Sequence, residues 1–358
     1  MAKKPLKKLL PKNFAEILKA AQISGDAAAA QAVFESCETD ARGGYGKRTA
    51  MMMSDCTPAL ARWLVEQGAD INAADDYGDT PLHGSAFARY AHHLPPEVLL
   101  DLGADIHKTC KAGRTALHSA ADGKNLKSVT LLLARGASVD VLSTDGLTPL
   151  EYALQRMSNT DLIDMIPVIN TLFASGARST QQSQAVVKRA VENFEFHRAG
   201  FNKDFVEETA AAVRELCQLF DLEPPALREI HDGKSPIFAV GETWLEQFNS
   251  LWQALIPSSG ACETVQGEVV RITGRVRDEL LRNGGANWNR DFSAMLQAWL
   301  EHTASHHALN DTLSSEASEI VALCRNCEDH TDRMIKLSLE WVKLNPMPIK
   351  LPKPSYKH

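Results

Sequence analysis

Apolar and polar positions in the first half of this chain recur with a period close to 33 residues. Gly78, Gly113 and Gly146 each precede a threonine by two residues, and a looser copy at Gly46 precedes Thr49 by three. The glycine spacings are 32, 35 and 33 residues. Self-similarity at such a period is the signature of a solenoid, in which each copy is one structural repeat.

A second landmark keeps phase with the first. Apolar stretches that read as helices end in glycine, which favours the left-handed conformation of a helix C-terminus; these glycines are Gly68, Gly103, Gly136 and Gly176. Thr80, Thr115 and Thr148 stand where the first helix of a copy would begin and can accept a backbone N–H there. Pro81 and Pro149 follow at the first helical position, where proline is tolerated.

These motifs resemble the ankyrin repeat family. The matching phrases are GDTPLHGSA (78–86), GRTALHSAA (113–121) and GLTPLEYA (146–153), together with the GAD-type helix ends, and the resemblance covers about residues 25–180. It implies that His83 and His118 hydrogen-bond backbone between neighbouring repeats and are not catalytic bases. Glu151 replaces the histidine in the last copy, which also argues against a shared catalytic role.

Two copies depart from the pattern. Residues 14–45 keep helical periodicity without the threonine-proline-leucine-histidine phrase and are expected to form a capping repeat. In the next copy, Ala50, Met51 and Met52 replace proline, leucine and histidine, and Met53 follows. These flexible methionines suit packing or contact with a ligand, and both interpretations stay open.

The second half is predicted to be helical without a repeat. Helical periodicity is expected over 204–222, 241–257, 263–285, 287–302 and 315–344. The fold class is therefore all-α, an ankyrin-repeat solenoid followed by an α-helical C-terminal domain. The predicted organisation is a basic N-terminal tail, the repeat domain, the helical domain and a proline-rich tail that is extended or disordered: 1–13, 14–180, 181–344 and 345–358.

Residues 251–292 are also similar to a domain that follows ankyrin-like repeats in uncharacterised bacterial proteins. That resemblance implies a bacterial origin and no mechanism. Charged residues at helical spacing in this segment can pair on one helix: Glu268, Arg271, Arg275, Glu279 and Arg282. Gln266 and Asn287 extend the set, which is either a structural salt-bridge lattice, a ligand or partner pocket, or a catalytic site. Gly267 and Gly274 would let another backbone approach the same helix.

Composition and charge narrow the function classes. A net charge of −7 argues against a nucleic-acid binder. No run of eighteen apolar residues predicts a membrane span, and no apolar run follows the N-terminal lysines as a signal peptide requires. Seven scattered cysteines indicate reduced thiols in a cytosol. We therefore expect a cytoplasmic protein that contacts neither membrane nor nucleic acid.

Two motifs give little support for a metal site or a nucleotide site. Cys324, Cys327 and His330, with His302 and His306 upstream, could meet as zinc ligands only if two helices face each other. Gly233-Lys234-Ser235 lacks the earlier glycine of a phosphate-binding loop, because position 228 is arginine. We therefore expect neither a metal nor a cofactor.

The expected function is protein–protein interaction through the concave repeat face. The partner, a protein of unknown identity, would contact variable turn and first-helix positions: Asp76, Tyr77, Asp79, Phe87, Tyr90, Lys111, Arg114, Asp145 and Leu147. An immunity or antitoxin factor or an adaptor fits this reading. One alternative is an enzyme that uses Glu268, Arg271, Arg275 and Glu279, and another is a secreted effector directed at a host.

Overall fold

The chain forms two compact units, here called the repeat unit and the C-terminal unit. The computed structural model describes residues 5–87, 93–354 and 356. The repeat unit comprises Met1–Asn193 with Lys203–Pro224, and the C-terminal unit comprises Phe194–Asn202 with Pro225–His358. Helices dominate the described residues of both units, so the predicted all-α class is confirmed.

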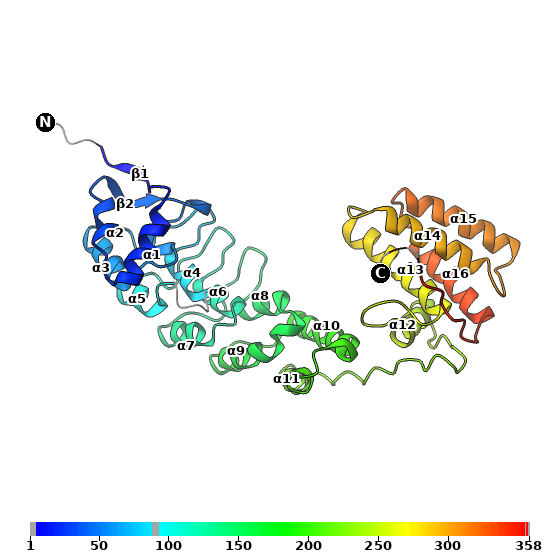
Figure 1. The fold of residues 1–358 in the computed structure, drawn as a ribbon. Helices are drawn as coiled ribbons and strands as arrows, with labels where there is room; N and C mark the ends of the chain where they lie inside the picture. The colour runs from blue at the N-terminus through cyan, green and yellow to red at the C-terminus, as the bar shows by residue number, and fades with distance from the viewer. Residues whose placement is uncertain (1–4, 88–92, 355, 357–358) are drawn as a thin grey trace. The chain divides into compact units, whose positions relative to one another are not determined.

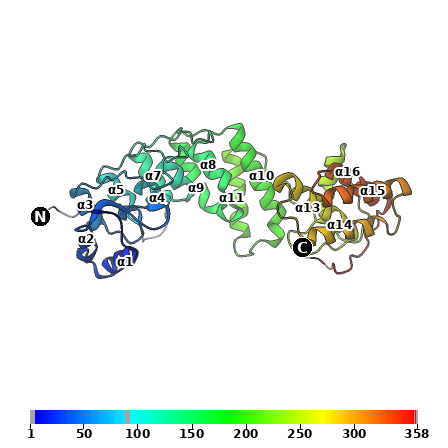
Figure 2. The ribbon, with the colours of Figure 1, turned by 90° about the horizontal axis from the view of Figure 1, so that it is seen from above.

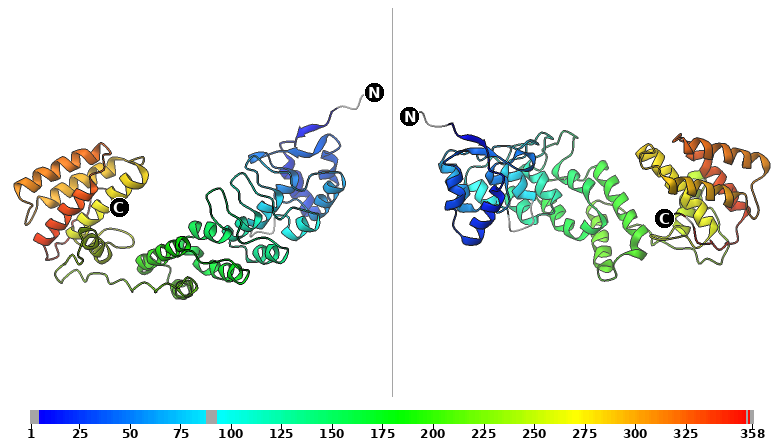
Figure 3. Two further views of the ribbon diagram at one scale, coloured as in Figure 1. Left: turned by 180° about the vertical axis from the view of Figure 1, so that it is seen from behind. Right: turned by 45° about the horizontal axis from the view of Figure 1, so that its top comes forward.

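Helices of the repeat unit stack in two rows, and the hairpins between them project from one side (Figures 1 and 3). The first helices after the cap are η2 (Ala50–Met52), α4 (Pro81–Phe87), α6 (Ala116–Asp122) and α8 (Pro149–Arg156). The second helices are α3 (Pro58–Glu66), α5 (Pro96–Asp101), α7 (Leu126–Ala134) and α9 (Leu162–Ala174), the last preceded by η3 (Asn159–Asp161). The cap is α1 (Phe14–Ser24) with α2 (Ala28–Val33).

His83 joins the start of its own helix to the next repeat. The N–H of Thr80 donates to Nδ1 of His83 over 3.2 Å, and Oγ1 of Thr80 lies 2.9 Å from the same nitrogen. Because Nδ1 accepts, the ring proton lies on Nε2, which donates to the carbonyl of Arg114 over 2.9 Å. The histidine is a structural connector, as the resemblance implied.

His118 repeats this arrangement one copy later. Its Nδ1 accepts from the N–H of Thr115 over 3.1 Å, and its Nε2 donates to the carbonyl of Leu147 over 3.1 Å. Both imidazoles are buried, so each satisfies three polar groups that water cannot reach.

Glu151 joins its own helix to the following segment in the same way, through a carboxylate. Oε2 accepts from the N–H and hydroxyl of Thr148, and Oε1 accepts from the hydroxyl of Thr180 over 2.7 Å. Thr180 in turn begins α10 (Gln181–His197), where its N–H donates to Oγ of Ser183. The connecting role therefore continues beyond the last recognisable copy, although the residue type changes from histidine to glutamate to serine.

This continuation moves the boundary between the units. The sequence placed the change of domain at residue 180, whereas contacts keep α10 up to Asn193 and α11 (Val206–Leu219) in the repeat unit. Helices α9 and α11 lie side by side (Figure 2), with the ring centroids of Phe173 and Phe220 5.3 Å apart. The glycine-threonine phrase that marks the repeats is missing here, so the sequence period ends before the stack does.

Hairpins of successive repeats are joined by backbone hydrogen bonds. The N–H groups of Asp76, Lys111 and Thr144 donate to carbonyls one hairpin back, over 2.8, 3.1 and 2.9 Å. Gly78 has φ +83°, and a Cβ there would lie 2.6 Å from the N–H nitrogen of Lys111. Glycine is required at this turn both by its conformation and by the closeness of the next hairpin.

The N-terminal segment contains a strand that the sequence did not indicate. β1 (Lys7–Leu9) pairs in parallel with β2 (Cys37–Arg42), so part of the expected basic tail of residues 1–13 is tied to the first hairpin. Leu10 is buried, which anchors this pairing. The short 3-10 helix η1 (Tyr45–Lys47) follows at the hairpin tip.

The second copy lacks the connector. Met52 occupies the place of His83 and His118, and a thioether cannot replace their hydrogen bonds. Oγ1 of Thr49 is buried and has no hydrogen-bond partner in the described part of the chain. Met51 and Met52 are buried, which favours packing over ligand contact for this methionine run.

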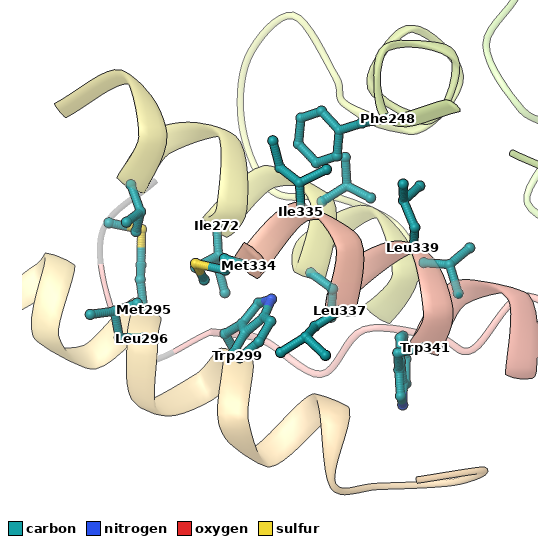
Figure 4. Close-up of a cluster of buried hydrophobic side chains, with 14 of the residues drawn as sticks. Phe248, Ile272, Met295, Leu296, Trp299, Met334, Ile335, Leu337, Leu339 and Trp341 are labelled. Atoms are coloured by element: carbon teal, nitrogen blue, oxygen red, sulfur yellow. The ribbon is translucent and has the colours of Figure 1, made fainter. Parts of the chain in front are cut away.

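The C-terminal unit is a helical bundle built around α13. It contains α12 (Trp244–Leu255), α13 (Val265–Asn283), α14 (Arg290–Thr303), α15 (Asp311–Arg325) and α16 (Thr331–Leu344). Helix α13 packs on α12, α14 and α16, while α15 lies against α14 and α16. In the core, Trp299 lies among side chains of α13 and α16 such as Ile272 and Met334 (Figure 4).

The single helix predicted over 315–344 is wrong, because the chain forms α15 and α16 there. Cys327 has a positive φ of 61°, and Oδ1 of Asp329 accepts from the N–H and hydroxyl of Thr331. This turn lets both helices bury their apolar faces in the same core. Within the described ranges, none of the helices combines the length and apolar content needed to cross a bilayer.

A buried polar group lies inside the bundle. Oγ of Ser338 accepts from Nε1 of Trp299 over 3.0 Å, lies 2.8 Å from Oγ1 of Thr273, and donates to the carbonyl of Met334. All three side chains of this trio are fully buried. One hydroxyl therefore links α13, α14 and α16.

Gly274 of α13 meets a side chain from α12. A Cβ there would lie 2.0 Å from the ring of Trp252, so the glycine lets this indole lie against the helix backbone. Gly267 instead faces the carbonyl of Leu255, at 3.3 Å from a Cβ in its place. The expected close approach of another backbone is therefore found at Gly267, and at Gly274 an aromatic ring takes that space.

Residues 345–354 with Tyr356, here called the strap, return in an extended conformation along α13. The N–H of Val265 donates to the carbonyl of Ile349 over 2.8 Å, and that of Leu351 donates to the carbonyl of Glu263 over 3.0 Å. The expected proline-rich tail is thus the extended of the two alternatives over its described part.

The two histidine connectors predict a pH-dependent stability of the repeat unit. Burial lowers the pKa of both His83 and His118, so as pH falls the unfolded chain takes up protons first. The free energy of unfolding should be constant above about pH 7.5 and fall as pH drops below about 6.5, the ordinary histidine pKa. Hydrogen exchange of the α6 and α8 amides at several pH values measures this.

The matched control is the double variant His83→Gln with His118→Gln. Glutamine keeps a donor and an acceptor but does not titrate between pH 5 and 8. The variant should lose part of the slope that the parent shows. An unchanged slope would show that these imidazoles do not carry the pH dependence.

Ser338→Ala should destabilise the C-terminal unit by about 1–3 kcal/mol, because it leaves the buried Trp299 N–H without an acceptor. Ser318→Ala is the control: Ser318 is exposed and also donates to the carbonyl four residues back, but it has no such partner. Five of the six tryptophans lie in this unit, so fluorescence during urea unfolding reports it. Equal effects of the two changes would contradict the expectation.

Candidate functional sites

Two tyrosines stand together at the tips of neighbouring hairpins. Tyr45 and Tyr77 precede Gly46 and Gly78 by one residue, so they take equivalent places in successive repeats. Their hydroxyls are 2.7 Å apart and their ring centroids 6.0 Å apart, yet 78% and 47% of their surfaces are exposed. This tyrosine pair presents large rings that hold each other in place, so little side-chain freedom remains to be lost on binding.

Charged groups surround the tyrosine pair. Nζ of Lys47 lies 3.6 Å from the carboxylate of Asp76, and both side chains are exposed. Nε of Arg48 lies 3.8 Å from Asp75, whose buried carboxylate also accepts from the N–H of Tyr77 over 2.8 Å. The carboxylate of Asp75 therefore stabilises the turn that carries Tyr77.

Most residues predicted to contact a partner lie on the surface. Asp76, Lys111 and Asp145 are exposed at hairpin tips, and Phe87 is 51% exposed at the end of α4. Tyr90 lies outside the described residues. The partner-binding role of these positions stays a prediction.

Three residues of the predicted set have structural contacts. Leu147 is 5% exposed and belongs to the core, so it cannot be a surface contact in this fold. The guanidinium of Arg114 donates to the hydroxyl of Tyr152 and lies 5.2 Å from the centre of its ring. Asp79 is half-buried in the turn, where its N–H donates to Asp75. Their tip-like spacing in the sequence did not reveal these inward contacts.

The charged set on α13 divides into separate groups. Glu268 and Arg271 are buried and form a bidentate ion pair, with nitrogen–oxygen distances of 2.6 and 2.8 Å. Although burial opposes the charge, pairing with Glu268 raises the pKa of Arg271. The hydroxyl of Tyr356 in the strap donates to the same carboxylate. Burial raises the pKa of the neighbouring Cys262 thiol to about 12.

The other members of the set lie elsewhere. Both the N–H and the side chain of Asn287 donate to Glu279, which stabilises the turn after α13. Gln266 is fully buried against the strap, and Arg275 is exposed. These residues do not converge on one pocket, so of the three interpretations left open by the sequence the structural lattice fits their geometry.

The sequence did not indicate that Tyr356 and Cys262 lie beside the Glu268–Arg271 pair, or that Tyr45 lies beside Tyr77 at the tips. Nothing in the local pattern marks Tyr356, because it reaches Glu268 across 88 positions of sequence. Tyr45 could have been found, since its distance of 32 residues from Tyr77 equals the spacing of the first two repeat glycines.

The candidate metal-binding and nucleotide-binding motifs lie in ordinary turns and packing contacts. Cys324 is buried, whereas Cys327 is exposed and faces Gly285. Among the described residues, no three histidine, cysteine or acidic side chains gather to hold a metal ion. Gly233-Lys234-Ser235 lies in a turn where Oδ1 of Asp232 accepts two backbone N–H groups, and the next helix begins at Trp244.

Family comparison supports the repeat geometry. Residues 49–92 and 96–182 match models described as ankyrin repeats in many copies and in three copies. The chain carries ankyrin repeats. They include the copies whose threonine and histidine form the connectors described above, and ankyrin repeats in general bind other proteins.

The relatives share only this part. A putative ankyrin repeat protein of fowlpox virus is 36% identical over 107 residues, 29% of this chain and 31% of the relative. The Neurogenic locus Notch protein of Drosophila melanogaster is 36% identical over 115 residues, 31% of this chain and 4% of its own length. A putative palmitoyltransferase of Danio rerio is 30% identical over 133 residues, which are 37% of this chain and 20% of the relative. The chain thus spans a third or less of these curated relatives.

Arg271→Ala should destabilise the C-terminal unit by about 3–5 kcal/mol, because it leaves the buried Glu268 carboxylate without its cation. The matched control is Arg275→Ala on the same helix, where the exposed side chain should contribute less than about 0.5 kcal/mol. Urea unfolding followed by tryptophan fluorescence measures both. Similar losses for the two arginines would contradict the buried ion pair.

Proposed function

We propose that this protein binds a partner protein through the hairpin tips of its ankyrin repeats. The observation that carries the proposal is the tyrosine pair, Tyr45 and Tyr77, exposed and preorganised on adjacent tips. Tyrosine is among the residue types that contribute most to binding free energy at protein interfaces. The stacked hairpins below it are linked by backbone hydrogen bonds, which fix the spacing of the tips.

The charges around the tyrosine pair would set specificity more than affinity. Lys47 and Asp76 are exposed and pair loosely, and Nζ of Lys111 donates to the carbonyl of Asp76. Exposed charges at the rim of an interface mainly steer association and reject wrong partners. Phe87 would add apolar area on the first-helix side of the same hairpins.

The cellular role is proposed at a coarser level. All seven cysteines lie among the described residues as free thiols, six of them buried, which supports a reducing compartment such as a cytosol. An adaptor or an immunity factor that covers a toxin would need only a binding surface of this kind. Bacterial origin follows from the resemblance of residues 251–292 and stays a prediction.

The test is a double substitution, Tyr45→Ala with Tyr77→Ala, measured on a partner captured from the native cytosol and then purified. Affinity should fall at least about 30-fold, which corresponds to about 2 kcal/mol. Calorimetry or surface plasmon resonance gives the value.

Phe238→Ala is the matched control, because Phe238 is an equally exposed aromatic residue in the C-terminal unit. It should leave the affinity unchanged. If the control weakens binding and the tyrosine variant does not, the recognition surface lies outside the repeats.

A further inference from the structure

One buried side chain of α13, that of Gln266, holds the strap by its backbone. Gln266 is fully buried, and its amide makes three hydrogen bonds to the strap: Nε2 donates to the carbonyls of Asn345 and Met347 over 2.7 Å each, and Oε1 accepts from the N–H of Ile349 over 3.1 Å. All three hydrogen bonds of this buried amide go to one extended segment, so Gln266 positions that segment.

Backbone pairing continues the contact. An antiparallel bridge joins Thr264 to Lys350, and two backbone hydrogen bonds flank it, from Val265 to Ile349 and from Leu351 to Glu263. This short backbone pairing resembles strand addition, a mode in which an extended peptide gains affinity from its main chain and specificity from alternate side chains.

Side chains supply the specificity. Ile349 and Leu351, two residues apart, pack against the bundle core, while the side chain between them belongs to Lys350. Five residues after Leu351, the hydroxyl of Tyr356 donates to the buried carboxylate of Glu268, and Arg271 lies 6.0 Å from the ring centre. The strap is therefore anchored by two aliphatic side chains and a tyrosine.

A pocket that is open to the surface adjoins one side of the strap. An open pocket of about 460 Å³ lies between Cys262, Glu263 and Thr264 on the groove and Pro348, Lys350 and Leu351 on the strap. Gly233 also lines it.

We propose that residues 263–271 form a peptide-binding groove whose resident ligand is the strap. Its ligand class is an extended peptide with aliphatic residues at its first and third positions and a tyrosine at its eighth, as in Ile349, Leu351 and Tyr356. The strap, held by the chain at Asn345, competes at the high effective concentration of a tethered ligand. A peptide of this class from another protein occupies the groove when the strap is released.

The test uses the full chain with a weakened strap. Ile349→Asp, Leu351→Asp and Tyr356→Ala together remove all three side-chain anchors of the strap but leave the groove intact. The probe is a fluorescent peptide with the native sequence of residues 345–358, followed by anisotropy. It should bind the triple variant at least 10-fold more tightly than it binds the parent chain.

Two matched probes show where the peptide binds. The same peptide with phenylalanine in place of its tyrosine should bind the triple variant several-fold more weakly, because Glu268 then has no hydroxyl to accept from. Adding Gln266→Ala to the triple variant should weaken the native peptide as well. If the triple variant keeps its tryptophan fluorescence and helicity and does not bind the peptide, the proposal is overturned.

Hydrogen exchange of the parent chain gives a second measurement that needs no variant. The amides of Ile349 and Leu351 should exchange at least 10-fold faster than the central amides of α13 and α16, because release of the strap opens them locally. Exchange of all these amides at one common rate would show that the strap leaves only when the whole bundle unfolds. That result would also overturn the proposal, and neither measurement depends on the tyrosine pair.

Discussion

The repeat unit depends on one side chain with two partners in each of three successive repeats. His83, His118 and Glu151 each bond to the threonine that begins their own helix and to the repeat that follows. Because these bonds are buried, losing one partner leaves polar groups that water cannot satisfy. The stack is therefore specified by orientation as well as by apolar contact, and the hairpin tips inherit their regular spacing from it.

The two units use buried polar groups for different purposes. In the repeat unit such groups connect neighbouring copies, whereas in the C-terminal unit Ser338 links three helices and Gln266 holds an extended segment. Glu268 and Arg271 could have been read as a catalytic pair from their spacing alone. Their bidentate contact and the hydroxyl of Tyr356 instead give them a role in binding the strap.

The repeat period could be read from the sequence because each repeat contacts mainly its neighbours. Gly78, Gly113 and Gly146 mark turns with positive φ, which favours glycine, and at Gly78 and Gly113 the next hairpin also leaves no room for a Cβ. The local pattern therefore carries the fold. The role of His83 and His118 followed from the family resemblance. Tyr77 was recognised as an exposed tip residue for the same reason, since tips are defined by their position in the repeat.

The tertiary structure alone decided contacts that join distant parts of the chain. Leu147 reads as a tip residue but is buried, and α10 and α11 continue the stack after the repeat phrase has ended. Tyr356 meets Glu268 only because the strap returns along α13. Local periodicity determines which face of a helix is apolar, but the free energy that selects these long-range partners comes from packing and hydrogen bonds that exist only once the chain has folded.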